Sequence, residues 1–176
     1  ADFIDALART FPPLVLVAFI AIFLALRRFL QSVVLSIKAI VLDLFSLVAT
    51  IGALVFVTKN HVAHHVFGAY DFPRIEAWVI IFLIAILFGL SMDYEIFIVS
   101  RIREAWLKGR TNDEAIIEGI AHTGGVVTSA ALILIGAMSG FIWGHFVGLQ
   151  QLGLGLALGI IIDASIVRLF LLPSVM

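Results

Sequence analysis

Asp93, Tyr94 and Glu95 are consecutive, so two carboxyl groups flank a phenol within an apolar stretch of the chain. The stretch begins near Ala77 and is closed by Arg101, so Asp93 lies roughly 12 Å from its basic end at the rise of an α-helix. Within a membrane, an ionisable group at that depth costs roughly 3 kcal/mol and persists where it faces a partner or a wet cavity. A carboxyl group in an apolar environment holds a proton more firmly than in water and can exchange it near neutral pH. The three side chains therefore predict an intramembrane proton relay, with a structural pair that ties two helices together as the alternative.

The composition is that of a membrane protein. Of 176 residues, 62% are hydrophobic and 13% are charged, and the mean hydropathy is +1.18, whereas soluble domains are about half apolar and about a quarter charged. The net charge of −1 argues against a nucleic-acid partner. Cysteine is absent, so the chain offers no thiolate metal site. No basic segment precedes the first apolar run, so we expect no signal peptide, and we expect further residues upstream.

The apolar stretches predict an all-α polytopic membrane protein, with residues 1–176 as a single transmembrane domain. The five predicted spans are residues 11–26, 33–57, 77–100, 124–140 and 146–172. Before the fourth span, Thr111 and Glu114 have the spacing of a capping box, which predicts that a helix begins there. The amphipathic residues 113–121 are expected to lie along the membrane surface.

Two further spans contain carboxyl groups. Asp43 lies in the second span, either as another intramembrane carboxylate or as a local ion pair beside Lys38. Gly155, Gly159 and Asp163 are spaced by four and share one helix face, so Asp163 is predicted on a close-packing side, away from lipid.

Asp93 and Tyr94 point about 100° apart on a helix, so they are not expected to pair with each other. Each requires a partner on a facing helix. Asp163, together with Arg168, is one candidate partner within this chain.

Small residues predict close helix contacts in the fourth span. Gly125, Ser129, Gly136 and Gly140 recur near the helical period and form a small face that another backbone can approach. In the connector between the second and third spans, three histidines have helical spacing that can present imidazoles to a metal. They are His61, His64 and His65. The cluster lacks acidic and thiol ligands, so we expect no metal site.

The basic residues predict the topology. The first loop region holds Arg27, Arg28 and Lys38, and the third holds Arg101, Arg103, Lys108 and Arg110. The second holds Lys59 and Arg74, and the fourth holds none. By the positive-inside rule the first and third loops are cytoplasmic, which puts the N-terminus outside and the C-terminus inside.

The central motif resembles a known transporter family. Gly89-Leu-Ser-Met-Asp93-Tyr94 has the form G-x-x-x-D-Y and is followed by Glu95, Ser100-Arg101 and Arg103-Glu104. This pattern is similar to the fourth or tenth span of MMPL transporters of the resistance-nodulation-division (RND) superfamily, and Glu95 favours the tenth, in the C-terminal repeat. Weaker similarities occur in the right order elsewhere: Lys38-Ala39, Thr128-Ser129-Ala130-Ala131 and Asp163-Ala-Ser-Ile-Val-Arg168 before Leu172-Pro173.

The resemblance implies a secondary transporter rather than an enzyme. It implies proton-driven export of lipids or lipid-like molecules across the bacterial cytoplasmic (inner) membrane, with protons as coupling ions and no other cofactor. Asp93 would carry the proton, and Tyr94 would hydrogen-bond the aspartate of the opposite repeat. The supporting polar groups would be Glu95, Ser129, Asp163 and Arg168. Separately, we predict helix-packing positions at Gly89, Gly155 and Gly159.

The resemblance also implies partners. A full transporter of this kind has two repeats, each with a first span, an extracytoplasmic porter domain and five further spans. This chain has five predicted spans and one Asp-Tyr pair. The expected partners are therefore the other repeat, the porter domains, the membrane lipids and a hydrophobic substrate.

Three alternatives remain open at this level. A SecD/SecF-like protein-export subunit has a similar membrane repeat but lacks G-x-x-x-D-Y-E. Intramembrane aspartyl proteases resemble one another in a Gly-x-Gly-Asp motif, which is absent before Asp93 and Asp163. A structural scaffold would have no need for three ionisable residues at depth.

Overall fold

The computed structural model describes residues 33–62 and 74–166, with residue 65 and scattered positions between 13 and 28. In chain order the elements are α2 (Val33–Lys59), α4 (Ala77–Leu107), α5 (Asn112–Ser139), the short 3-10 helix η1 (Gly140–Trp143) and α6 (Val147–Ile162). Four helices in the described ranges are long and apolar enough to cross a membrane, which confirms the all-α membrane class. The sequence predicts one span more, and that span, 11–26, lies largely outside the described residues.

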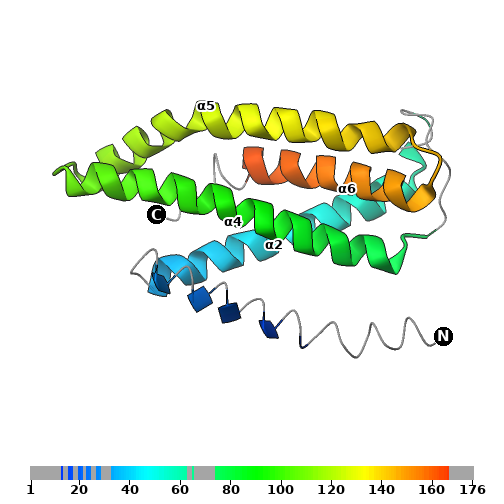
Figure 1. The fold of residues 1–176 in the computed structure, drawn as a ribbon, viewed down its shortest axis with the longest axis horizontal. Helices are drawn as coiled ribbons and strands as arrows, with labels where there is room; N and C mark the ends of the chain where they lie inside the picture. Colours follow the sequence, from blue (N-terminus) through cyan, green and yellow to red (C-terminus); the bar gives the residue numbers. More distant parts are fainter. Residues whose placement is uncertain are drawn as a thin grey trace.

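α6 is the most deeply packed helix of the bundle. Figure 1 shows α4 and α6 between α5 on one side and α2 on the other, and each of these two helices contacts both outer ones. In the apolar window of α6, 67% of the residues are buried, against 17% in α5. α5 therefore presents most of its apolar surface outward, to lipid or to another protein surface.

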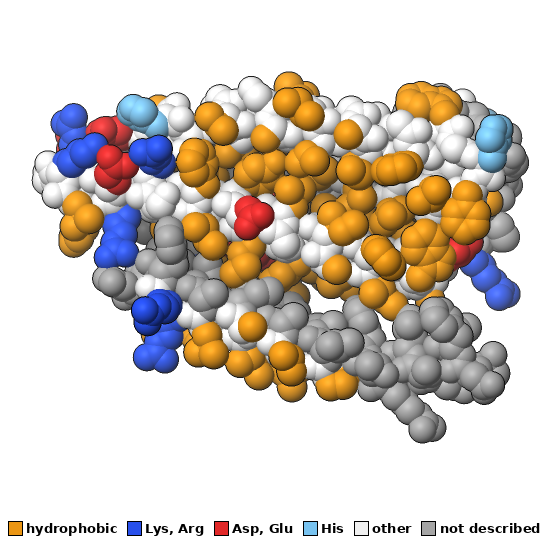
Figure 2. Space-filling view, in the orientation of Figure 1, with side chains coloured by type: hydrophobic (Ala, Val, Ile, Leu, Met, Phe, Trp, Pro, Cys, Tyr) orange, Lys and Arg blue, Asp and Glu red, His pale blue; other side chains and the backbone are white. Residues whose placement is uncertain are grey.

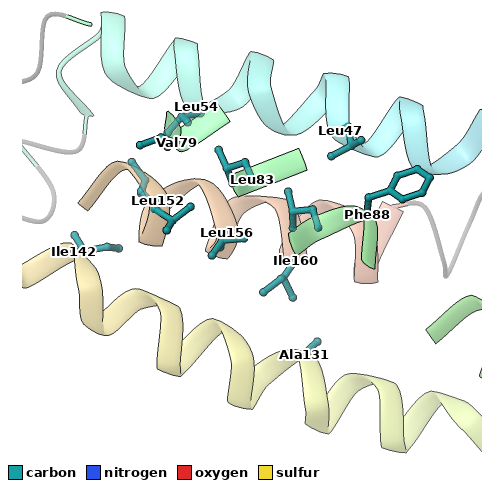
Figure 3. Close-up of a cluster of buried hydrophobic side chains, with 12 residues drawn as sticks. Leu47, Leu54, Val79, Leu83, Phe88, Ala131, Ile142, Leu152, Leu156 and Ile160 are labelled. Carbon is teal, nitrogen blue, oxygen red and sulfur yellow. The ribbon is translucent and has the colours of Figure 1, made fainter. Parts of the chain in front are cut away.

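The main core lies where α2, α4 and α6 meet (Figure 3). Leu54 of α2, Leu83 of α4 and Leu156 of α6 are each at most 2% exposed and belong to one buried cluster. Because lipid tails are as apolar as leucine, helix association in a membrane depends on close packing rather than on removal from water. The fit of these side chains therefore sets how the three helices are placed.

A glutamine side chain fixes the start of α4 against α6. Gln151 of α6 is fully buried. Its carboxamide oxygen accepts a hydrogen bond from the backbone N–H of Glu76 (3.0 Å), and its amide nitrogen donates to the carbonyl of Arg74 (2.8 Å). Both bonds satisfy backbone groups just before the first turn of α4, where a helix leaves its N–H groups without helical partners.

The turn from α4 to α5 follows its sequence signals. Gly109 has φ 88°, a conformation that glycine adopts without steric cost. Thr111 then caps α5, because its hydroxyl accepts from the backbone N–H of Glu114 (3.4 Å). In return, the carboxylate of Glu114 accepts from the backbone N–H of Thr111 (3.1 Å). The predicted capping box is confirmed.

α5 is one continuous helix, and the prediction that residues 113–121 lie along the membrane surface is wrong. Ala115 and Gly119 in this segment are buried and lie against α4, where Ile102 contacts Gly119 most closely. The amphipathic pattern of this segment therefore reflects packing on the last turns of α4, which itself extends beyond the predicted span to Leu107.

The end of α6 changes its winding. Beyond Ile162, the described residues 163–166 form a π-helical turn. Such turns are rare and occur mostly as single turns inside α-helices, frequently at functional sites. The last residues of the predicted fifth span, 167–172, lie outside the described part of the chain.

Candidate functional site

α4 carries polar residues on opposite faces. Phe82, Ile86, Gly89 and Asp93 are exposed and recur every three or four residues, so they form a single stripe along the helix. Ser91 is buried, as expected for a residue about 200° around the helix axis from Asp93. The residues of the predicted motif therefore lie on two different sides of α4.

Asp93 is the last residue of the exposed stripe and lies near the middle of α4. It is about 24 Å from the first residue of α4 and about 21 Å from the last, at 1.5 Å of rise per residue. Figure 2 shows hydrophobic side chains over much of this face of the bundle, whereas most charged side chains gather toward its ends. In a bilayer this position of Asp93 is at the depth of the hydrocarbon.

Tyr94 and Glu95 diverge from Asp93. Tyr94 is half-buried and packs against a cluster that includes Ile102 of α4 and Ala115 of α5. Glu95 is 6% exposed. One residue of the triplet thus faces outward, one faces α5 and one faces the interior, which agrees with the expectation that Asp93 and Tyr94 do not pair.

A buried polar triad joins the three core helices. The hydroxyl of Ser91 on α4 is hydrogen-bonded to Asp43 on α2 and, at 3.1 Å, to the carboxylate of Asp163 on α6. All three side chains are buried, with exposed fractions of 6%, 4% and 7% respectively. Asp43 is thus an interior carboxylate. A cavity of about 10 Å³ lies among these residues, and Ser46 and apolar side chains complete its lining.

The triad corrects one sequence expectation. Asp163 bonds Ser91, on the far side of α4 from the exposed Asp93, so Asp163 is not placed to serve as a partner of Asp93. Sequence reasoning missed Ser91. The available signal was its position four residues after the buried Leu87, which places both on the inward face of the helix.

The glycines of α6 lie where close packing requires them. A Cβ atom on Gly155 would lie 2.7 Å from Leu83 Cδ1, and one on Gly159 would lie 2.5 Å from Leu87 Cδ1. Gly89 differs, because a Cβ there would meet nothing within 4 Å among the described residues. Any close neighbour of Gly89 must therefore come from outside this part of the chain.

Other predicted residues are not brought to the triad. Ser129 is exposed, and its hydroxyl donates to the carbonyl of Gly125 in its own helix (2.8 Å). Within the described residues, the predicted small face of α5 meets no other backbone, since Gly125, Gly136 and Gly140 have open space around them. Arg168 lies outside the described residues. The described ranges contain no group of three or more His, Asp or Glu side chains arranged for a metal, although His64 is not among the described residues.

Comparison with known proteins identifies the family of this chain. A model of the MMPL family matches residues 1–176. This chain belongs to the MMPL family. The family is part of the RND superfamily, so the motif resemblance is confirmed and the SecD/SecF-like and protease assignments are set aside.

Three similar proteins illustrate the relationship. A membrane protein of Streptomyces coelicolor is 40% identical over 99% of this chain and 25% of its own length. The mycolic acid-containing lipids exporter MmpL11 of Mycolicibacterium smegmatis is 37% identical over 99% of this chain and 18% of its own length. The trehalose monomycolate exporter MmpL3 of Mycobacterium tuberculosis is 37% identical, with the same two coverages. The chain thus spans a quarter or less of the length of these relatives.

Proposed function

We propose that this chain forms half of the membrane part of a secondary transporter that exports lipids or lipid-like molecules and is driven by protons. Asp93 is the proton carrier, and Tyr94 hydrogen-bonds the corresponding aspartate of the other repeat. The substrate class follows the relatives named as exporters of mycolic acid-containing lipids and of trehalose monomycolate.

The exposed position of Asp93 midway along α4 carries this proposal. A charged group facing lipid at this depth costs roughly 3 kcal/mol, so such groups face a protein partner or water and take part in ion or proton movement. A surface of the other repeat that contains a polar group is the partner we propose. Protonation of Asp93 in one step of the cycle and ionisation in another then changes how strongly the two surfaces associate.

Gly89 supports the same interface. It lies one turn before Asp93 in the exposed stripe, and nothing in the described residues occupies the space beside it. A glycine on an exposed membrane-helix face allows a second helix to approach closely. The approach of that helix would bring a partner side chain within reach of Asp93 and the neighbouring Tyr94.

The proposed setting is the bacterial cytoplasmic membrane. The basic residues Arg101, Arg103, Lys108 and Arg110 at the junction of α4 and α5 put that end on the cytoplasmic side, with the N-terminus outside and the C-terminus inside. A membrane potential contributes about 2.3 kcal/mol per charge per 100 mV. One proton moving through the relay per cycle therefore supplies enough energy to bias a conformational change.

The test replaces Asp93 by asparagine in the intact protein. Asp93→Asn keeps the size of the side chain but cannot carry a proton, so we expect proton flux and lipid export to fall to background in liposomes under a pH gradient. Asp113→Asn is the matched control, because Asp113 is exposed in the first turn of α5, outside the apolar part of the bundle, and flux should be unchanged. Wild-type flux in Asp93→Asn would remove Asp93 from the mechanism.

A further inference from the structure

A second cavity lies at the end of the bundle where α4 and α5 join. Figure 2 shows basic, acidic and histidine side chains gathered at that end. The cavity has a volume of about 180 Å³, many times the smallest space that holds one water molecule. Its ionisable lining residues are Arg101, Glu104 and Lys108 of α4 and Glu118 and His122 of α5. The cavity therefore lies between two helices and is lined mainly by groups that bind ions.

This cavity lies at the level of the lipid headgroups. α4 has 31 residues and is about 46 Å long, whereas the hydrocarbon layer of a membrane is about 30 Å thick. Asp93 lies near the middle of α4, and Arg101 and Lys108 lie about 12 Å and about 22 Å beyond it at the rise of an α-helix. The α4 side of the cavity thus extends from the edge of the hydrocarbon into the headgroup region.

The basic residues at the cavity have donors beyond those of their ion pairs. Glu104 pairs with both Arg101 and Lys108, at 2.9 Å in each case, and Arg110 pairs with Glu118 at 3.1 Å. In these pairs three basic side chains surround two carboxylates. A guanidinium has five N–H donors and an ammonium has three, so each cation can bind a further anion while its ion pair persists.

Apolar side chains accompany the charged ones. Trp106, Leu107 and Ile117 are 57%, 68% and 68% exposed, and each is adjacent in sequence to a residue of the cavity lining. Tryptophan is enriched where a membrane meets water, and surfaces that combine apolar and basic side chains bind anionic lipids. A phospholipid presents a phosphate and acyl chains together, so it matches this combination better than a soluble anion does.

We propose that the cavity binds the phosphate group of an anionic phospholipid of the surrounding membrane. Arg101 and Lys108 contact the phosphate oxygens from α4, in place of or beside Glu104. From α5, Nδ1 of His122 is bonded to the carbonyl of Glu118 (2.9 Å), so Nε2 is the ring nitrogen that can meet the lipid. Basic pockets between transmembrane helices bind lipid headgroups in this way. The bound lipid joins α4 to α5, and its binding does not depend on the proposed proton transport.

Native mass spectrometry of the intact protein in detergent tests this site. Phosphatidylglycerol is the probe, and phosphatidylcholine with the same acyl chains but no net charge is the control lipid. We expect phosphatidylglycerol to bind more tightly, and Arg101→Gln and Lys108→Gln each to weaken it about fivefold, which corresponds to about 1 kcal/mol per basic residue. Arg103→Gln is the matched control, because Arg103 lies on the same helix but is not part of the cavity lining. Its affinity for phosphatidylglycerol should equal that of the wild type.

Glu104→Gln distinguishes lipid binding from a purely structural role. The carboxylate of Glu104 competes with the phosphate for both cations, so this variant should bind phosphatidylglycerol more tightly although it loses two ion pairs. These side chains are about half exposed, and exposed ion pairs contribute little to stability. Each variant should therefore fold, which thermal unfolding without added lipid checks.

Three results would overturn the proposal. Equal affinity for the two lipids would show that the charge of the headgroup is not recognised. A loss in Arg103→Gln as large as in Arg101→Gln would show a diffuse effect of surface charge instead of a site. Inorganic phosphate that displaces phosphatidylglycerol at equal concentration would refute the assignment to a lipid.

Discussion

Gly119 of α5 lies close against the backbone of α4 at Ile102. A Cβ atom at this position would lie 2.4 Å from Ile102 Cγ1 and 2.9 Å from both the Cα and the backbone nitrogen of the same residue. Carbon atoms in contact are normally about 3.5–4.0 Å apart. The side-chain carbon can rotate away, but the backbone atoms cannot. Gly119→Ala therefore forces α5 away from α4 by roughly half an ångström or more.

The expected magnitude follows from two opposing terms. Inserting a methyl group into a filled contact costs about 1–3 kcal/mol, whereas alanine in place of glycine inside a helix gains about 0.5–1 kcal/mol. The net effect of Gly119→Ala is a loss of stability of up to about 2.5 kcal/mol. Gly125 lies in the same helix, and a Cβ atom there would meet nothing within 4 Å among the described residues, so Gly125→Ala should retain only the gain.

Thermal unfolding of the intact protein in detergent provides the assay. Gly125→Ala should unfold at or above the wild-type temperature, and Gly119→Ala should unfold below it. Proton flux should fall in Gly119→Ala as well, because Tyr94 packs against the cluster that Ile102 and Ala115 form between α4 and α5. If Gly119→Ala unfolds at the same temperature as Gly125→Ala or above it, the close approach at Ile102 is not what limits this position.

Two further substitutions test the frame around the site. Gly159→Leu should lower the unfolding temperature in detergent, since even a Cβ there would lie 2.5 Å from Leu87 Cδ1 and 3.0 Å from Thr50 Cγ2. Overpacking of this kind costs about 1–3 kcal/mol. Unchanged stability would contradict the close packing of this face of α6. Thr111→Ala removes the acceptor for the backbone N–H of Glu114 and should lower the stability of the helix by about 0.5–2 kcal/mol. The loss should be measured as faster amide hydrogen exchange in the first turn of α5. Exchange at the wild-type rate would show that the capping box contributes little.

Local signals predicted the helices well because they act within a few residues. The capping box at Thr111 follows from residues that are three positions apart in the sequence. The spacing of Gly155, Gly159 and Asp163 predicted a shared face, and all three are buried. In each case the helical period alone determines which side chains lie together.

The contacts of a side chain with residues of other helices could not be predicted from the helical period. A serine such as Ser91 in an apolar helix most often bonds its own backbone, as Ser129 does. Its contacts with Asp43 and Asp163 depend on how α2 and α6 pack around α4. For the same reason the sequence suggested Asp163 as a partner of Asp93, although the two lie on different sides of α4. The position of a residue within an apolar stretch of the sequence indicates its depth in the membrane. The helix that its side chain faces depends on how the helices pack together.

Asp93 and the buried contacts of Ser91 are expected to move together, because α4 carries both residues. Ser91 and Asp93 are two residues apart, so a rotation or shift of α4 that changes the surroundings of Asp93 also moves the hydroxyl that bonds Asp163. Rigid helices with packed contacts transmit such displacements. α6 must follow, because Gly159 holds it in close contact with Leu87 of α4. A conformational change driven at Asp93 is therefore expected to move α4 and α6 together and to be absorbed at their contacts with the outer helices.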